Sequence, residues 1–86
     1  MKLIAISAIW CPACLIMSKR VKEALQQYPD WTFEKLDLDM DEEEALKWNP
    51  GKTLPVFIVL DQSGNEVRRV IGELSKDRLI KDVFHG

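Results

Sequence analysis

The hydrophobic pattern changes its period along the chain, and each change predicts a different element. Residues 3–9 form an apolar run with several β-branched side chains, which predicts a strand buried on both faces. From residue 14 onwards the apolar positions recur every three or four residues, which predicts an amphipathic helix that ends before Pro29, because proline cannot continue a helix. The expected buried face of this helix holds Cys14, Met17, Val21, Ala24, Leu25 and Tyr28.

Shorter elements are predicted after Pro29. Residues 31–38 largely alternate between apolar and polar side chains and predict a second strand. Residues 42–48 predict a short helix, with acids in its first turn where the helix dipole favours them and with Asp39 or Asp41 as the capping residue. The sequence "NPGK" that follows ends this helix.

The last third of the chain predicts a hairpin and a helix. Residues 54–60 are the most apolar stretch and predict a central strand. Residues 61–65 have the composition of a turn and residues 66–71 predict a further strand, so that residues 54–71 form a hairpin. Ser75 is expected to cap a final helix, whose apolar stripe consists of Leu79, Ile80, Val83 and Phe84.

The resulting order of elements is β-α-β-α-β-β-α. Its length fits a single domain that covers residues 1–86. Only a parallel crossover joins the first two strands, and a hairpin joins the last two. The fold class is therefore predicted to be α/β, with a four-stranded mixed sheet and helices on both faces.

Composition and charge narrow the functional classes. With 47% hydrophobic and 30% charged residues, the chain has the composition of a soluble globular protein. A net charge of −2 and the lack of a basic run interleaved with aromatics exclude nucleic-acid binding. The apolar run near the N-terminus is too short to span a membrane, and no small-residue cleavage site follows it. We therefore expect a cytoplasmic protein without membrane contact.

Cys11 and Cys14 are the only cysteines in the chain. In a reducing cytosol, such a closely spaced pair is more often catalytic or metal-binding than structural. A zinc site needs four ligands, and one cysteine pair with one histidine does not supply them, so no metal is expected. An inert pair of core cysteines is the plainer alternative. Against it, Cys11 lies at the predicted start of a helix, where solvent access is expected.

The positions of the two cysteines predict different roles in disulfide exchange. The unpaired N–H groups and the dipole at a helix N-terminus favour an anion, and so favour the reactive thiolate form of Cys11. Cys14 lies one turn later on the apolar face, where it should be more buried and less acidic. Cys11 is then expected to attack a substrate disulfide, and Cys14 to attack the resulting mixed disulfide and release the reduced substrate.

Several segments together resemble the thioredoxin superfamily over nearly the whole chain. They are "WCPAC" at residues 10–14, "KLDLD" at 35–39, "TLPVFIV" at 53–59, and Gly72 after the last strand. The chain lacks the extra N-terminal strand and helix of full thioredoxins, so it resembles the minimal, glutaredoxin-sized thioredoxin fold. The resemblance implies a dithiol–disulfide oxidoreductase that reduces protein disulfides. It implies no bound cofactor, because a redox-active Cys11–Cys14 disulfide carries the electrons.

The resemblance also implies roles for neighbouring residues. Pro55 would be the cis-proline of the family, which turns the backbone of Leu54 towards Cys11 so that a substrate peptide can pair with it as an added strand. Trp10 would lie beside the cysteines and shield them, although a tryptophan at a strand end can also be ordinary core. The implied substrate groove consists of Trp10, Pro12, Ala13, Leu54, Pro55 and Gly72.

The chain departs from the thioredoxin pattern at one position of known importance. Thioredoxins carry a buried aspartate six residues before the first cysteine, where it helps proton transfer to the second, and this chain has Ala5 there. Proton transfer to Cys14 is therefore expected to use water or another group, with Lys35 and Glu73 as candidates. A lysine on a strand is also commonly just solvent-facing.

Other positions favour a glutathione-dependent alternative. Pro12 and Thr53 are glutaredoxin-like, whereas Ile9 stands where glutaredoxins usually place a basic residue. The expected partners are disulfide-containing proteins and thioredoxin reductase as electron donor, with glutathione as the alternative donor. The protein is expected to be a monomer. A third alternative is a thioredoxin-like interaction module without turnover.

Overall fold

The computed structural model of the chain describes residues 1–85, and the side chains of residues 1–84. The elements appear in the predicted order. They are β1 (Lys2–Ser7), α1 (Pro12–Leu25), β2 (Thr32–Asp37), α2 (Glu42–Leu46), β3 (Val56–Leu60), β4 (Glu66–Ile71) and α3 (Lys76–Leu79), which continues as a π-helix, η1 (Ile80–His85). None of the described helices is long and apolar enough to cross a membrane.

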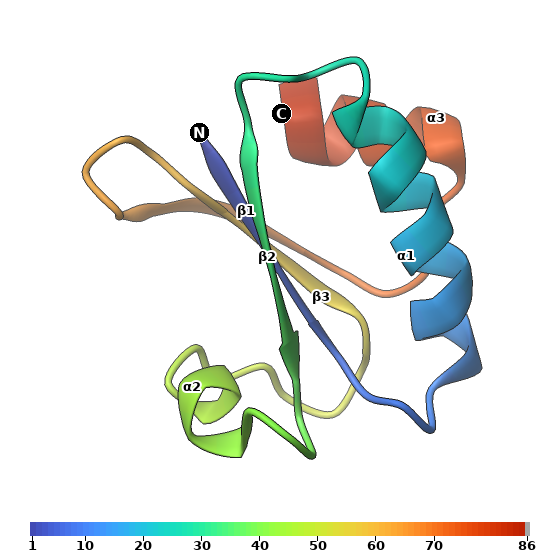
Figure 1. Cartoon of the computed structure of the whole chain (residues 1–86), viewed down its shortest axis with the longest axis vertical. Coiled ribbons are helices and arrows are strands. Elements are labelled where there is room, and N and C mark those ends of the chain that lie inside the picture. The colour runs from blue at the N-terminus through green and yellow to red at the C-terminus, as the bar shows by residue number, and fades with distance from the viewer. Residues whose placement is uncertain (86) are drawn as a thin grey trace.

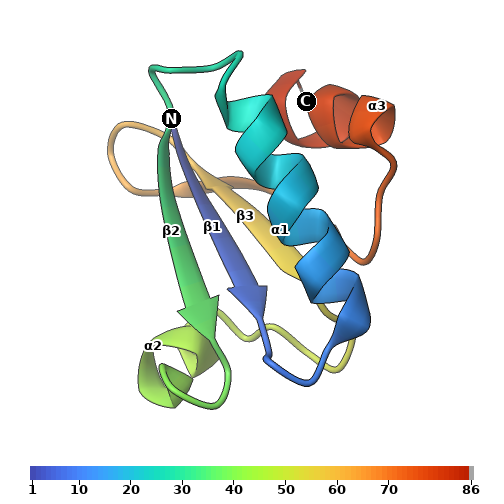
Figure 2. The same ribbon diagram turned by 45° about the vertical axis from the view of Figure 1, so that its right-hand side comes forward.

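The strands form one mixed sheet in the order β2-β1-β3-β4. β1 pairs in parallel with β2, whereas the pairs β1–β3 and β3–β4 are antiparallel. This topology brings the carboxyl ends of β1, β2 and β4 and the amino end of β3 to one edge of the sheet. α1 begins at that edge (Figure 2).

Helices cover both faces of the sheet, as predicted. α1 and α3 lie together on one face (Figure 1), over a core cluster that includes Leu3, Met17, Phe57 and Val83. The short helix α2 contributes Ala45 to the cluster on the other face, together with Ile4, Ile6, Val56 and Ile58. All residues of β3 are buried, which confirms the prediction of a central strand.

The ends of several elements differ from the sequence prediction; β3, for example, begins at Val56 and not at residue 54. β1 ends at Ser7 and not at residue 9, because the chain turns there and the Cys11 N–H donates to the carbonyl of Ala8 at 3.1 Å. Ile9 is consequently 71% exposed. The final helix has only four α-helical residues before its π-helical part. Its predicted cap is confirmed, because the Ser75 hydroxyl accepts the N–H of Arg78 at 3.2 Å.

The prediction that an aspartate side chain caps α2 is wrong. Asp41 occupies the N-cap position, but its side chain makes no capping hydrogen bond. Its carboxylate instead accepts the backbone N–H of Asp37 at 3.1 Å. The carboxylate of Asp37 in turn accepts the N–H groups of Asp39 and Met40. The acids therefore stabilise the turn between β2 and α2.

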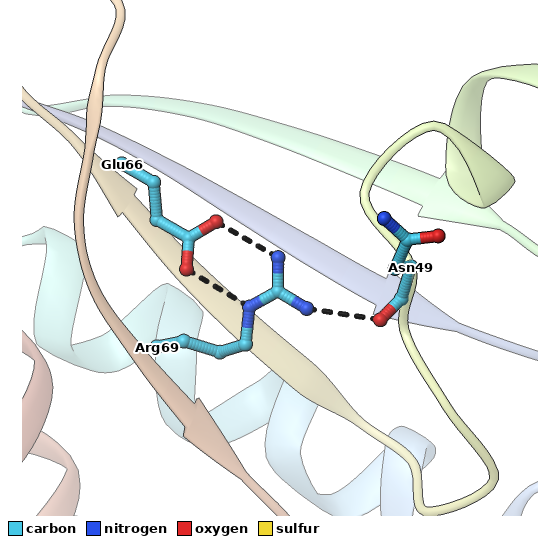
Figure 3. Close-up of polar contacts among 3 residues, drawn as sticks. All are labelled: Asn49, Glu66 and Arg69. Carbon is cyan, nitrogen blue, oxygen red and sulfur yellow. Dashed lines mark hydrogen bonds and ion pairs between the residues drawn. The ribbon is translucent and has the colours of Figure 1, made fainter.

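Arg69 of β4 fixes the turn that follows α2. Its guanidinium makes two hydrogen bonds to the carboxylate of Glu66, at 3.0 and 2.8 Å, and donates to the backbone carbonyl of Asn49 at 3.0 Å (Figure 3). Asn49 adopts a positive φ of 51°, which a short polar side chain tolerates. The contact ties the segment leading to Leu54 and Pro55 to the edge of the sheet.

A pair of identical substitutions tests the assignment of the core. Ile58 is fully buried in β3, whereas Ile71 is 50% exposed in the neighbouring strand β4. We expect Ile58→Val to lower the free energy of unfolding by about 0.5–1.5 kcal/mol, because it removes a buried methylene group. Ile71→Val should change it by less than about 0.5 kcal/mol. Urea denaturation of both reduced variants measures the difference, and equal losses would contradict this packing.

Candidate active site

Three segments meet at the edge of the sheet where α1 begins. Cys11 follows β1, Pro55 precedes β3, and Gly72 follows β4. The peptide bond between Leu54 and Pro55 is cis. The N–H of Gly72 donates to the carbonyl of Pro55 at 2.9 Å, which joins the two segments. Gly72 has a φ of +98°, a conformation that favours glycine, although a Cβ added there would meet no other atom within 4 Å.

Cys11 is the N-cap residue of α1. Its backbone is extended, and its Sγ accepts the N–H of Cys14 at 3.3 Å. Pro12 occupies the first turn, where the missing N–H of proline leaves no helical hydrogen bond unmade. The sulfur thus takes one of the unpaired donors at the start of the helix, in the place where a serine or aspartate oxygen commonly sits. This geometry suits a thiolate at Cys11.

Both thiols are more deeply buried than the position of Cys11 at a helix start suggested. Cys11 is 7% and Cys14 is 5% exposed, so the expected difference between them is small. Both belong to the core cluster that contains Ala8, Leu54 and Val56. They are free thiols, and no cluster of three potential metal ligands exists among the described residues.

The residues of the expected groove surround these buried thiols. Trp10 is 64% exposed, so it projects largely into solvent beside the cysteines and does not enclose them. Pro12 is exposed, Ala13 is half-buried, and Leu54 is buried at 9% exposure. Within the described residues, no backbone hydrogen bond uses the N–H or the carbonyl of Leu54. Both groups of Leu54 therefore remain available to an added strand.

The environment of Cys14 strongly favours the neutral thiol. Burial raises the pKa of Cys14 from 9.0 to about 11, and the hydrogen bond with Cys11 and the charge of Cys11 add to this effect. A hydrogen bond from the backbone of Ala8 and the positive charge of Lys35 act in the opposite direction and lower the pKa. Cys14 is thus protonated at neutral pH.

The two candidates for proton transfer lie in different places. Lys35 lines a cavity next to Cys14, opposite Ala5 in the pairing of β1 with β2. Lys35 as a whole is exposed. Glu73 is also exposed, but no hydrogen bond or ion pair of the described residues connects it to either cysteine. The structure therefore brings Lys35 into the site and leaves Glu73 outside the contacts of the thiols.

Two residues that sequence reasoning assigned to no site hold the loop after β4. The Leu74 N–H donates to the Met17 sulfur at 3.3 Å, and the guanidinium of Arg20 donates to the Leu74 carbonyl at 2.6 Å. These contacts fix the segment of Gly72 against α1, one turn beyond Cys14. The apolar stripe of the helix indicated that Met17 is buried, but no local pattern indicated its polar contact.

Comparison with known proteins agrees with this geometry. The thioredoxin family model matches residues 1–85. The chain belongs to the thioredoxin family. It is 31% identical over 86 residues to thioredoxin H-type of Fagopyrum esculentum, an alignment that covers 98% of this chain and 72% of that protein. It is 32% identical over 77 residues to thioredoxin H7 of Arabidopsis thaliana, covering 90% of this chain and 57% of that protein.

Solved thioredoxin structures share the fold. Thioredoxin-2 of the malaria parasite superposes with a TM-score of 0.85 at 27% identity, covering 99% of this chain and 82% of that one. Schistosoma mansoni thioredoxin gives a TM-score of 0.83 at 30% identity, covering 98% and 76%. By family, the chain is a thiol–disulfide oxidoreductase.

The raised pKa of Cys14 predicts a pH dependence of stability. Folding favours the protonated thiol, so this contribution is complete below about pH 9 and is lost as the pH rises towards 11. We expect the reduced protein to lose about 2–3 kcal/mol at most over this range through Cys14.

Cys14→Ser is the matched control for this effect, because it keeps the shape but removes the titrating group. The quantity to measure is the difference in unfolding free energy between the two reduced proteins, followed from pH 7 to 11. Alkaline titrations of groups that do not interact with Cys14 affect both proteins and cancel in this difference. A difference that stays constant with pH would contradict the raised pKa.

Proposed function

We propose that the chain reduces the disulfides of protein substrates through Cys11 and Cys14, with a mixed disulfide as intermediate. The observation that carries this proposal is the contrast between two adjacent thiols. The sulfur of Cys11 accepts a helix N-terminal N–H, whereas Cys14 is held neutral by burial. Such a pair suits one thiol for attack and the other for resolution.

The proposed reaction has two exchange steps. The Cys11 thiolate attacks one sulfur of the substrate disulfide, and the other substrate sulfur leaves as a thiolate. Cys14 then loses its proton and attacks the Cys11 sulfur. The second substrate thiol departs, and the two cysteines are left oxidised as a disulfide. Two electrons have passed to the substrate, and a separate reductant must return them.

The surface around Cys11 supports a polypeptide substrate. The free backbone groups of Leu54 lie next to Pro55 and offer main-chain hydrogen bonds to an extended segment. Ile9 and Trp10 are exposed beside Cys11 and supply apolar contact area. Because Cys11 itself is only 7% exposed, a substrate sulfur must approach closely along this surface.

The proposal includes a monomer that acts in the cytoplasm with thioredoxin reductase as electron donor. Reduction of a protein disulfide can be followed with NADPH and thioredoxin reductase, and in parallel with NADPH, glutathione and glutathione reductase. We expect turnover with the first system and its loss in Cys11→Ser. Turnover with glutathione alone would favour the alternative that Pro12 and Thr53 suggest. Binding of a disulfide protein without exchange in either system would favour an interaction module.

The roles of the two cysteines predict opposite behaviour of two variants. Cys14→Ser should accumulate a stable mixed disulfide with a disulfide substrate, because Cys11 still attacks but nothing resolves the product. Cys11→Ser should form no such adduct, since Cys14 is neutral at pH 7. Non-reducing electrophoresis and mass spectrometry identify the linked cysteine. Adducts that form through Cys14 alone would reverse the assignment.

A further inference from the structure

One polar side chain is buried within the core face of the central strand β1. Ser7 is 4% exposed and is the only polar residue as deeply buried as the core among those that the structure describes. Alternation along the strand places it on the same face as Leu3 and Ala5, which is the face that α1 covers. Its hydroxyl therefore points towards the helix that carries Cys14.

Ser7 and Cys14 line the same cavity between α1 and the sheet. About 10 Å³ of the cavity is accessible to the centre of a water molecule, and the wider space of about 240 Å³ includes open solvent. Its remaining polar lining residues are Ser18 of α1 and Lys35 of β2, and the other walls are apolar: Ala5, Met17, Val21, Phe33, Pro55 and Phe57. Ser18 is half-buried and Lys35 is exposed, so the polar groups lead from the buried thiol to the surface.

The size of the cavity and its few polar lining residues allow a single water molecule there. Its enclosed part admits about one water molecule, and such a molecule needs two to four polar partners. Most of the lining is apolar, and the residues of the lining that carry polar groups are Ser7, Ser18, Cys14 and Lys35. No hydrogen bond among the described residues involves the Ser7 hydroxyl. None of the described side chains has a fully buried polar atom without a partner, so the Ser7 oxygen is not fully buried. Water in the cavity is thus the available partner of Ser7.

The resolving step requires a route for the proton of Cys14. The charged and titratable groups acting on this thiol are Cys11 on the same helix and Lys35 on β2, whereas β3 and the segment before it contribute apolar Pro55 and Phe57. No carboxylate is among them. The positive charge of Lys35 lowers the pKa of Cys14 and so stabilises its thiolate.

We propose that a water molecule in this cavity carries the proton of Cys14 to solvent, and that Ser7 is the positioning residue that holds it. This inference rests on the proposed function, in which Cys14 resolves a mixed disulfide. The proton passes from the thiol to the water and outwards past Lys35. The Cys14 thiolate then forms the bond to Cys11 as the substrate thiolate leaves and takes up a proton from solvent.

A hydroxyl suits this role because it accepts and donates hydrogen bonds at once. It holds the water at a fixed place while leaving one donor of the water free to reach the next molecule outwards. The methyl group of an alanine would leave the same cavity without this anchor. A threonine would retain the hydroxyl, so the two substitutions separate hydrogen bonding from packing.

The test compares Ser7→Ala with Ser7→Thr in reaction with a chromogenic aryl disulfide, dithiobis-nitrobenzoate. Attack by Cys11 releases the first coloured thiol, and resolution by Cys14 releases the second. We expect Ser7→Ala to slow the second release about five- to tenfold at pH 7 with the first unchanged, in line with the loss of one hydrogen bond. The deficit should shrink towards pH 11 as hydroxide takes the proton directly, and Ser7→Thr should restore the rate to within about twofold.

Each departure from this result overturns a specific statement. Equal second-release rates in Ser7→Ala and wild type would sink the water relay. A slower rate that is independent of pH, or that threonine does not restore, would show a structural role only. If the wild type releases only one thiol, the proposed function fails instead.

A second measurement does not depend on turnover. In a Cys11→Ser background, alkylation of Cys14 by iodoacetamide follows the formation of its thiolate. Ser7→Ala should shift the midpoint of this profile to higher pH, because it removes an anchor of the water that solvates the thiolate. Ser7→Thr should leave the midpoint near that of Cys11→Ser alone. Identical midpoints with and without the Ser7 hydroxyl would overturn the proposal.

Discussion

The pairing of two almost wholly apolar strands, β1 and β3, is the constraint on which the rest of the structure depends. Because both faces of these strands are buried, the sheet must be covered on both sides. The chain therefore turns back directly after β1 and lays α1 along one face before β2 pairs in parallel. The start of α1 is thereby placed at the edge where β3 begins and β4 ends, and Cys11 becomes its N-cap.

The same burial gives different properties to Cys11 and Cys14, two thiols that are three residues apart. The sulfur of Cys11 accepts a backbone N–H at the helix start, while Cys14 lies one turn further along the helix and is desolvated. Desolvation outweighs the opposing effects of the Ala8 backbone and of Lys35 on the pKa of Cys14. With Ala5 in place of a carboxylate, polarity near this thiol comes from hydroxyls and one lysine that line a small cavity. The site thus combines largely apolar walls with a few residues that carry polar groups.

Contacts between segments far apart in the chain fix the relative positions of the three segments that form the site, those of Cys11, Pro55 and Gly72. Hydrogen bonds join Gly72 to Pro55 and Arg69 to Asn49. Leu74 makes hydrogen bonds with Met17 and Arg20. Each of these uses a backbone group of a loop, which would otherwise need water as a partner. The arginines act here through hydrogen bonds to carbonyls. The rigidity of the site therefore depends on side chains that do not themselves take part in disulfide exchange.

Local patterns in the sequence determined most of the fold, because hydrophobic period, proline and capping residues act over one or two turns of chain. They predicted every strand and helix, the Ser75 cap and the mixed sheet, and the spacing of Cys11 and Cys14 indicated the chemistry. They misjudged the side chain of Asp41, since either a helix or the preceding turn can use a carboxylate. They gave no sign that Ser7 faces Cys14, that Met17 accepts a hydrogen bond or that Trp10 projects into solvent. Those features depend on which residues meet across the fold, and only the tertiary structure decided them.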